Sequence, residues 1–192
     1  MTELHDRVIE LSKKFGLSHN GSSLTCVGII DEIYSLKQKD DPFILSCGHA
    51  SLGLYVTIEK HKGIDAEKIL SHHGAHPERC DQCGIYCSTG SLGHGLGIAL
   101  GMAMADRDRD VWCLISDGEM FEGLTWEVAN VMRRYLVTNL HVYLNFNGLS
   151  AYSEVRKWMI KNITTIMPSI VVKMTNVEDY GLEGLSAHYV KL

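Results

Sequence analysis

Two polar side chains follow apolar segments that have the character of buried strands. Asp117 comes after the apolar residues 111–115 and Ser116, and Asn147 comes after a second apolar segment, residues 140–146. The helical pattern of residues 122–136 lies between them, so this unit predicts two parallel, neighbouring strands. Ligands of open parallel sheets bind at the carboxyl ends of the strands, and carboxylate and carboxamide oxygens suit Mg²⁺ or Ca²⁺. The spacing therefore indicates a metal-bridged phosphate or diphosphate site.

An ordinary turn is the alternative at each of these positions. Asp117 and Asn147 are both followed by Gly, and Asp-Gly and Asn-Gly are common turn dipeptides. Their placement at matching ends of one strand–helix–strand unit favours the binding site.

A cluster of cysteines could bind a different metal. Cys80, Cys83 and Cys87 form a C-x₂-C-x₃-C pattern, and His72, His73 and His76 lie just upstream. Three thiolates and one imidazole, which we take as His76, would complete a tetrahedral zinc site. Reduced thiols in a loop and a redox-active C-x-x-C pair are the alternatives, although a thioredoxin-like context is missing.

Several histidines and glycines stand at the predicted ends of elements. His19, His49, His76 and His94 flank small polar residues, so some of them could converge on one cleft. The segment 93–97, Gly-His-Gly-Leu-Gly, superficially resembles a dinucleotide fingerprint but lacks the preceding strand, so close helix packing by Gly93, Gly97 and Gly101 is favoured.

The composition bounds the class of protein. A chain of 192 residues with 45% hydrophobic and 21% charged residues fits one globular domain. The formal charge of −5 gives no reason to expect a nucleic acid or an anionic membrane as partner. We find no secretory signal pattern and no apolar stretch that could span a membrane. Cysteines without a disulfide framework indicate a reducing compartment, so we expect a cytoplasmic protein in which Cys26, Cys47 and Cys113 are core residues.

Helical and apolar segments alternate along the chain, which predicts an α/β layered domain. We expect helices at residues 4–15, 23–34, 50–60, 65–70, 93–105, 122–136 and 152–166. We expect strands at residues 43–46, 111–115, 140–146 and 169–174, a long loop at 71–90 and a polar tail to residue 192.

Taken in order, these motifs resemble one family. Residues 116–118 (SDG) followed by Asn147 resemble the motif of thiamine diphosphate enzymes, which is usually Gly-Asp-Gly and a later Asn. Residues 43–49 (FILSCGH), 74–78 (GAHPE) and 88–95 (STGSLGHG) are similar to successive motifs of the amino-terminal half of transketolase. Residues 18–25 (SHNGSSLT) resemble the opening of its split forms. The resemblance covers nearly the whole chain.

The resemblance implies a three-layer thiamine diphosphate-binding fold with a mostly parallel sheet that is shortened at the C-terminus, and a single diphosphate-binding domain over residues 1–192. Asp117, Asn147 and the carbonyl of Leu149 would hold Mg²⁺ or Ca²⁺. The implied contacts to thiamine diphosphate come from Gly90, Ser91, Leu92, Ser116, Asp117, Gly118, Glu119, Asn147 and, more loosely, His188.

The resemblance also implies catalytic roles. His19, His49 and His76 would line the substrate channel, and Glu122 and Glu127 would link paired active sites. The cofactor would take up a ketol fragment as a stabilised carbanion, while histidines move protons near neutral pH. On the residues alone, the two glutamates are equally compatible with a solvated helix face, because a spacing of five places them about 140° apart.

The sequence departs from the family at several points. Ser116 replaces the first Gly of the motif, and the cysteine cluster is not a general family feature. The pyrimidine-binding and C-terminal domains are not found in these 192 residues. We therefore expect the thiamine diphosphate-binding subunit of a split transketolase, which acts on sugar substrates with a separate pyrimidine-domain subunit in an α₂β₂ assembly. The alternatives are another thiamine diphosphate enzyme component, such as a deoxyxylulose-phosphate synthase or a 2-oxo acid decarboxylating enzyme, and a non-catalytic binding protein that zinc stabilises.

Overall fold

A parallel β-sheet forms the middle layer of the computed structural model, which describes residues 2–192 apart from the side chain of His188. The strands are β1 (Phe43–Leu45), β2 (Val111–Ser116), β3 (Leu140–Phe146) and β4 (Val171–Met174). They lie side by side in sequence order, and each neighbouring pair is parallel. The prediction that the strands before Asp117 and Asn147 are parallel neighbours is confirmed.

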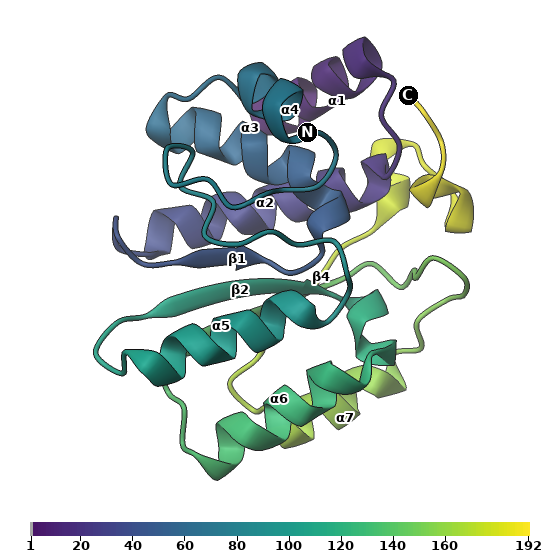
Figure 1. Cartoon of the computed structure of the whole chain (residues 1–192). Coiled ribbons are helices and arrows are strands. Elements are labelled where there is room, and N and C mark those ends of the chain that lie inside the picture. Colours follow the sequence, from purple (N-terminus) through teal and green to yellow (C-terminus); the bar gives the residue numbers. More distant parts are fainter. Residues whose placement is uncertain (1) are drawn as a thin grey trace.

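Helices cover both faces of this sheet, and Figure 1 shows the three layers. One face carries α1 (Glu3–Phe15), α2 (Asn20–Leu36), α3 (Ser51–Lys62) and α4 (Ala66–His73). The other face carries α5 (His94–Ala105), α6 (Gly123–Arg134) and α7 (Trp158–Ile166). The three-layer α/β prediction is confirmed. None of the helices in the described part of the chain combines the length and apolar character needed to cross a membrane.

Strands β1, β2 and β3 are apolar at nearly every position because both of their faces are buried, whereas the edge strand β4 is half-buried or exposed. Leu45 and Leu114 pack into the core beneath α1–α4, whereas Ile44, Cys113 and Ile115 pack into the core beneath α5–α7. Alternate side chains of a strand point to opposite faces, so one continuous apolar segment supplies two cores.

The helix predicted after Asp117 starts within one residue of its expected position, but a turn that was not predicted comes before it. A 3₁₀ turn, η2 (Asp117–Phe121), comes first, and α6 starts at Gly123. Two side chains of α6 donate hydrogen bonds to carbonyls of this turn. Thr125 Oγ1 donates to the carbonyl of Glu119 at 2.7 Å, and Trp126 Nε1 donates to the carbonyl of Met120 at 2.9 Å.

Two segments near the C-terminus also differ from the prediction. Helix α7 starts at Trp158, six residues later than expected, since Val155 N–H donates to the Gly148 carbonyl at 2.8 Å and holds the preceding residues in a closed loop. The predicted polar tail contains the short turns η3 (Val177–Tyr180) and η4 (Gly184–His188). It buries Val177 and Ala187 in the core beneath α1–α4.

Glycines allow α5 to approach its neighbours closely. A Cβ added at Gly97 would lie 3.2 Å from Leu124 Cδ2, and one at Gly95 would lie 2.6 Å from Ser46 Cα. The predicted role of Gly101 is wrong, because a Cβ there would meet nothing within 4 Å. Gly95 is the position at which the helix touches the end of β1, and it places the start of α5 at the carboxyl ends of the strands.

Candidate active site

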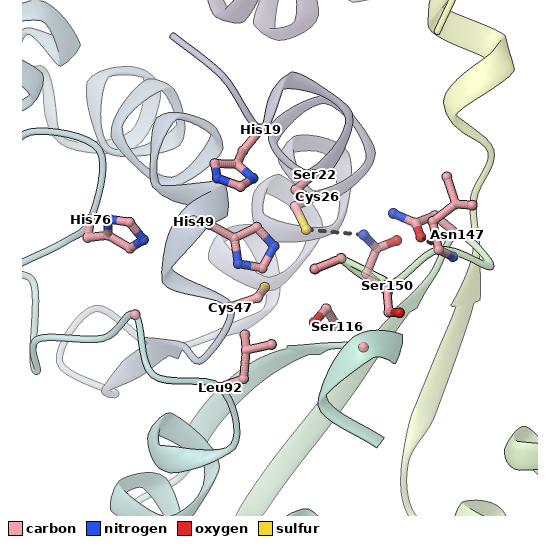
Figure 2. A pocket seen from close by; sticks show the side chains of 15 residues that line it. His19, Ser22, Cys26, Cys47, His49, His76, Leu92, Ser116, Asn147 and Ser150 are labelled. Atoms are coloured by element: carbon pink, nitrogen blue, oxygen red, sulfur yellow. Dashed lines mark hydrogen bonds between the residues drawn. The ribbon is translucent and has the colours of Figure 1, made fainter. Parts of the chain in front are cut away.

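A cavity of about 220 Å³ lies at the carboxyl ends of β2 and β3 (Figure 2). The start of α2, the short turn η1 (Gly48–Ala50), the loop before α5 and the loop after β3 all contribute to its wall. The lining residues are His19, Ser22, Cys26, Cys47, His49, His76, Gly90, Leu92, Ser116, Gly118, Asn145, Asn147, Leu149, Ser150 and Ala151. Segments far apart in the sequence thus meet at the strand ends.

Asp117 lies between two lining residues and is fully buried, with 0% of its surface exposed. Its Oδ2 accepts a hydrogen bond of 2.6 Å from the N–H of Gly148, which joins the ends of β2 and β3. Within residues 2–192 as described, no group donates a hydrogen bond to Oδ1. Burial raises the pKa of this carboxyl to about 7, although backbone N–H groups of Gly148, Gly118 and Asn147 act in the opposite direction. A buried carboxylate oxygen without a donor is costly, and a bound cation would compensate it.

Asn147 and Leu149 line the same end of the cavity, next to Gly148. Asn147 Oδ1 accepts a hydrogen bond of 2.9 Å from the N–H of Leu149, which fixes the turn after β3. A carboxamide oxygen keeps a second lone pair for another partner. The oxygens of Asp117 and Asn147 therefore form a hard donor set of the kind that suits Mg²⁺ or Ca²⁺.

Glu119 has a positioning role and is not among the lining residues, which differs from the implied cofactor contact. Its buried carboxylate accepts hydrogen bonds from the Ser46 hydroxyl, from Gly93 N–H at 2.9 Å and from Ser116 N–H at 2.8 Å. Burial raises the pKa of Glu119, while these donors lower it. This one side chain joins the ends of β1 and β2 to the start of α5.

Ser116 occupies the position at which the family motif has Gly. Its backbone is extended, with φ −94° and ψ 160°, so a side chain is accommodated without strain. The hydroxyl lies 3.4 Å from Glu119 Oε2, as part of a capping box at the start of η2.

Three of the four histidines predicted at element ends, His19, His49 and His76, line the cavity, whereas His94 does not. The rings of His19 and His49 are half-buried, with their centroids 5.4 Å apart, and His76 is exposed. Figure 2 shows His19 and His49 next to each other, with His76 to the left of them and Asn147 on the opposite side. The site thus has two neighbouring imidazoles and a third at the rim.

The remaining predicted residues divide between the cavity wall and positions outside it. Gly90 and Leu92 line the cavity, whereas Ser91 is exposed outside it. Glu122 is half-buried and Glu127 is exposed, and neither lines the cavity. The side chain of His188 falls outside the described part of the chain.

Sequence reasoning missed the floor of the cavity. Asn145 Nδ2 donates to Thr25 Oγ1 at 2.9 Å and to Cys26 Sγ at 3.2 Å, the second bond being drawn in Figure 2. A hydrogen bond with Cys26, together with burial, raises the pKa of the Cys47 thiol well above its ordinary value, so this thiol is neutral. Asn145 is a polar residue in an apolar strand and stands two positions before Asn147, so both side chains point to the same face. This spacing could have indicated Asn145 as a further lining residue.

The cysteine cluster brings together a different set of residues from the one predicted. The ligand atoms of His73, Cys80 and Cys83 all lie within 4.8 Å of one another. His76 lines the cavity instead, and Cys87 packs against the core beneath α5–α7. The predicted ligands His76 and Cys87 are therefore corrected: only two of the four predicted residues converge, and His73 joins them.

A parallel sheet with helices on both faces and a cavity at the strand ends, with histidine and amide side chains in its wall, defines the class of α/β ligand-binding domains. Residues 31–180 match the family model described as "Transketolase, thiamine diphosphate binding domain". The chain belongs to the transketolase family, and the match is to its thiamine diphosphate-binding domain.

Individual relatives and structures agree with this assignment. An apulose-4-phosphate transketolase subunit of Phocaeicola vulgatus is 32% identical over 164 residues, which cover 74% of this chain and 58% of that protein. Transketolase of Mycoplasma genitalium is 29% identical over 171 residues, covering 79% of this chain and 26% of that protein. The structure of transketolase from Leishmania mexicana has the same fold, with a TM-score of 0.69 and 18% identity over 85% of this chain and 30% of that one. The chain thus spans only part of the length of these relatives.

Proposed function

We propose that this chain is the thiamine diphosphate-binding subunit of a split transketolase-like enzyme. The enzyme would transfer a two-carbon ketol unit between sugar substrates, and a separate subunit would provide the pyrimidine-binding domain in an α₂β₂ assembly. The family match supports the cofactor class. The relative from Phocaeicola vulgatus is itself named as a subunit, which favours a divided enzyme.

The buried, donor-free oxygen of Asp117 is the observation that carries this proposal. Asp117 Oδ1, Asn147 Oδ1 and the carbonyl of Leu149 would hold Mg²⁺ or Ca²⁺ at the ends of β2 and β3. This donor set fits the metal, because hard cations take carboxylate, amide and carbonyl oxygens and share phosphate oxygens with them.

The neighbouring backbone would receive the rest of the cofactor. Gly118 and Ser116 line the cavity beside Asp117, while Gly90 and Leu92 line it from the loop before α5. Bound thiamine diphosphate would supply an electron sink for the transferred fragment.

The histidines would serve the substrate. His19 and His49 lie in contact distance of each other in the wall, and His76 lies at the exposed rim. Imidazole groups exchange protons near neutral pH, so these residues would bind sugar hydroxyls and hold or release their protons. Three histidines favour ketol transfer over a 2-oxo acid reaction, whose small substrate offers no row of hydroxyls.

The two glutamates would face a partner. Glu122 and Glu127 lie outside the cavity at the start of α6, where at least Glu127 is exposed. We propose that they link active sites across the α₂β₂ assembly.

Calorimetric titration of thiamine diphosphate with Mg²⁺ tests this function, with the chain alone and mixed with a pyrimidine-domain subunit. We expect saturable binding in the mixture, and ketol transfer from xylulose 5-phosphate only there. Turnover of pyruvate in place of the sugar would indicate another thiamine diphosphate reaction. An absence of saturable binding in both samples would contradict the proposal and favour a non-catalytic binding protein.

A further inference from the structure

We propose that His73, Cys80 and Cys83 bind one Zn²⁺ ion, and that this ion holds in place the loop that brings His76 and Gly90 to the cavity. The three residues come from the end of α4 and from a hairpin in the loop before α5. Zinc binding by this cluster does not depend on ketol transfer.

The hairpin has the backbone of a metal-binding knuckle. Cys80 and Ile85 exchange two backbone hydrogen bonds of 2.9 Å, which close a tight turn over the C-x-x-C-G segment. Gly84 turns the chain with a φ of +72°, a conformation that favours glycine. The N–H of Cys83 donates to Cys80 Sγ at 3.2 Å. An amide directed at sulfur stabilises a thiolate, which is the form that binds metal.

The distances between the ligand atoms fit a tetrahedral site after a small adjustment. Zinc bonds of about 2.3 Å to sulfur and about 2.0 Å to nitrogen place tetrahedral S and N ligands about 3.5 Å apart, and two S ligands about 3.8 Å apart. His73 Nε2 lies 3.5 Å from Cys83 Sγ. The two sulfurs are 2.9 Å apart, so a rotation of the thiols must separate them by about 0.9 Å. All six cysteines are free thiols, so none of these atoms is held in a disulfide.

The ligand chemistry selects zinc. Two thiolates and an imidazole are a soft donor set, which binds Zn²⁺ in preference to Mg²⁺ or Ca²⁺. The three side chains are half-buried, and a water molecule would take the fourth position. Cys87 is directed into the apolar core and takes no part.

The strands of this hairpin continue to the cavity. Thr89 N–H donates to the Pro77 carbonyl at 3.1 Å, and Thr89 Oγ1 donates to the Leu45 carbonyl at 2.7 Å. Beyond this pair, His76 contacts Gly90 so closely that a Cβ on the glycine would lie 3.0 Å from His76 Cδ2. A metal that fixes the hairpin therefore also fixes the rim residue His76.

Metal analysis of the full chain tests the proposal. The chain is purified without chelators from cells grown with zinc, and its metal content is measured by mass spectrometry. We expect one zinc ion per chain, lost in Cys80→Ser and in Cys83→Ser but retained in the matched control Cys87→Ser. Replacement by Co²⁺ should give thiolate-to-cobalt charge-transfer bands and intense visible bands of a tetrahedral site.

A second measurement covers the case in which the serine variants do not fold. In the unmodified chain, alkylation of Cys80 and Cys83 should be slow with zinc bound and fast after chelation, while alkylation of Cys87 should not change. The proposal is overturned by wild-type protein that holds no zinc after metal-replete preparation, by loss of zinc in Cys87→Ser, or by alkylation rates that chelation leaves unchanged. Cofactor binding, followed separately by calorimetry, tests the proposed function and not this site.

Discussion

Replacement of Asp117 by Asn should stabilise the metal-free protein at alkaline pH while it abolishes cofactor binding. The carboxyl of Asp117 is fully buried, and burial raises its pKa from 3.8 to about 7. The folded state therefore binds this proton more tightly than the unfolded state does. Tighter proton binding by Asp117 adds to the free energy of unfolding. This contribution is fully present below pH 3.8 and is lost as the pH rises through about 7.

The magnitude follows from the size of the shift. About three pKa units at about 1.4 kcal/mol each give an upper bound of about 4 kcal/mol for the cost of ionising Asp117 in the metal-free fold. Asn is neutral at every pH and its carbonyl oxygen can still accept the hydrogen bond from Gly148. At pH 8 the metal-free variant should thus be the more stable protein by up to about 4 kcal/mol, and the difference should shrink towards pH 4.

Urea unfolding in magnesium-free buffer at pH 4, 6 and 8 measures this effect, with Asp40→Asn as the control because Asp40 is an exposed carboxylate. Calorimetry with Mg²⁺ and thiamine diphosphate then follows binding. A variant that is less stable than the wild type at pH 8, or a difference independent of pH, would refute the reasoning. So would a variant that keeps the wild-type affinity for the metal and the cofactor.

Three further changes test other parts of the site. Glu119→Gln should lower stability by about 1–3 kcal/mol, because the NH₂ group of Gln cannot accept a hydrogen bond and leaves at least one of the donors to Glu119 unpaired; unchanged urea unfolding would contradict this role. Gly95→Ala should lower the free energy of unfolding by about 1–3 kcal/mol, because its Cβ would meet Ser46 Cα at 2.6 Å. The control Gly28→Ala, which places its Cβ in open space on α2, should leave the free energy of unfolding unchanged or raise it. Urea unfolding measures both variants. His49→Asn should reduce kcat by about 10²-fold or more in the presence of the proposed pyrimidine-domain subunit, while calorimetry shows unchanged cofactor binding; equal losses of both would indicate that His49 binds the cofactor.

The fold was predictable because its signals are local. Apolar segments of strand length alternate with helical segments, and this pattern predicts a parallel sheet with two covered faces. Asp117 and Asn147 could be located in the same way, since each follows its strand directly and parallel strands end at one edge. The cavity position therefore followed from element order alone.

The remaining features depend on side-chain direction, which spacing does not give. His73 and His76 both lie upstream of the cysteines, and only the turn after α4 decides that His73 meets Cys83 while His76 turns to the cavity. Glu119 follows the motif like a cofactor contact, yet its carboxylate turns inward to Ser46. The 3₁₀ turn before α6 likewise accepts hydrogen bonds from the side chains of Thr125 and Trp126, and a helical pattern does not give the direction of these side chains.

Anomalous diffraction from a crystal grown with Mn²⁺ and thiamine diphosphate tests the central claim most directly. We predict one manganese ion at the ends of β2 and β3, about 2.2 Å from Asp117 Oδ1 and Asn147 Oδ1 and bonded to the diphosphate of the cofactor. A manganese ion bonded to neither side chain, or a diphosphate bound elsewhere on the molecule, would contradict the account.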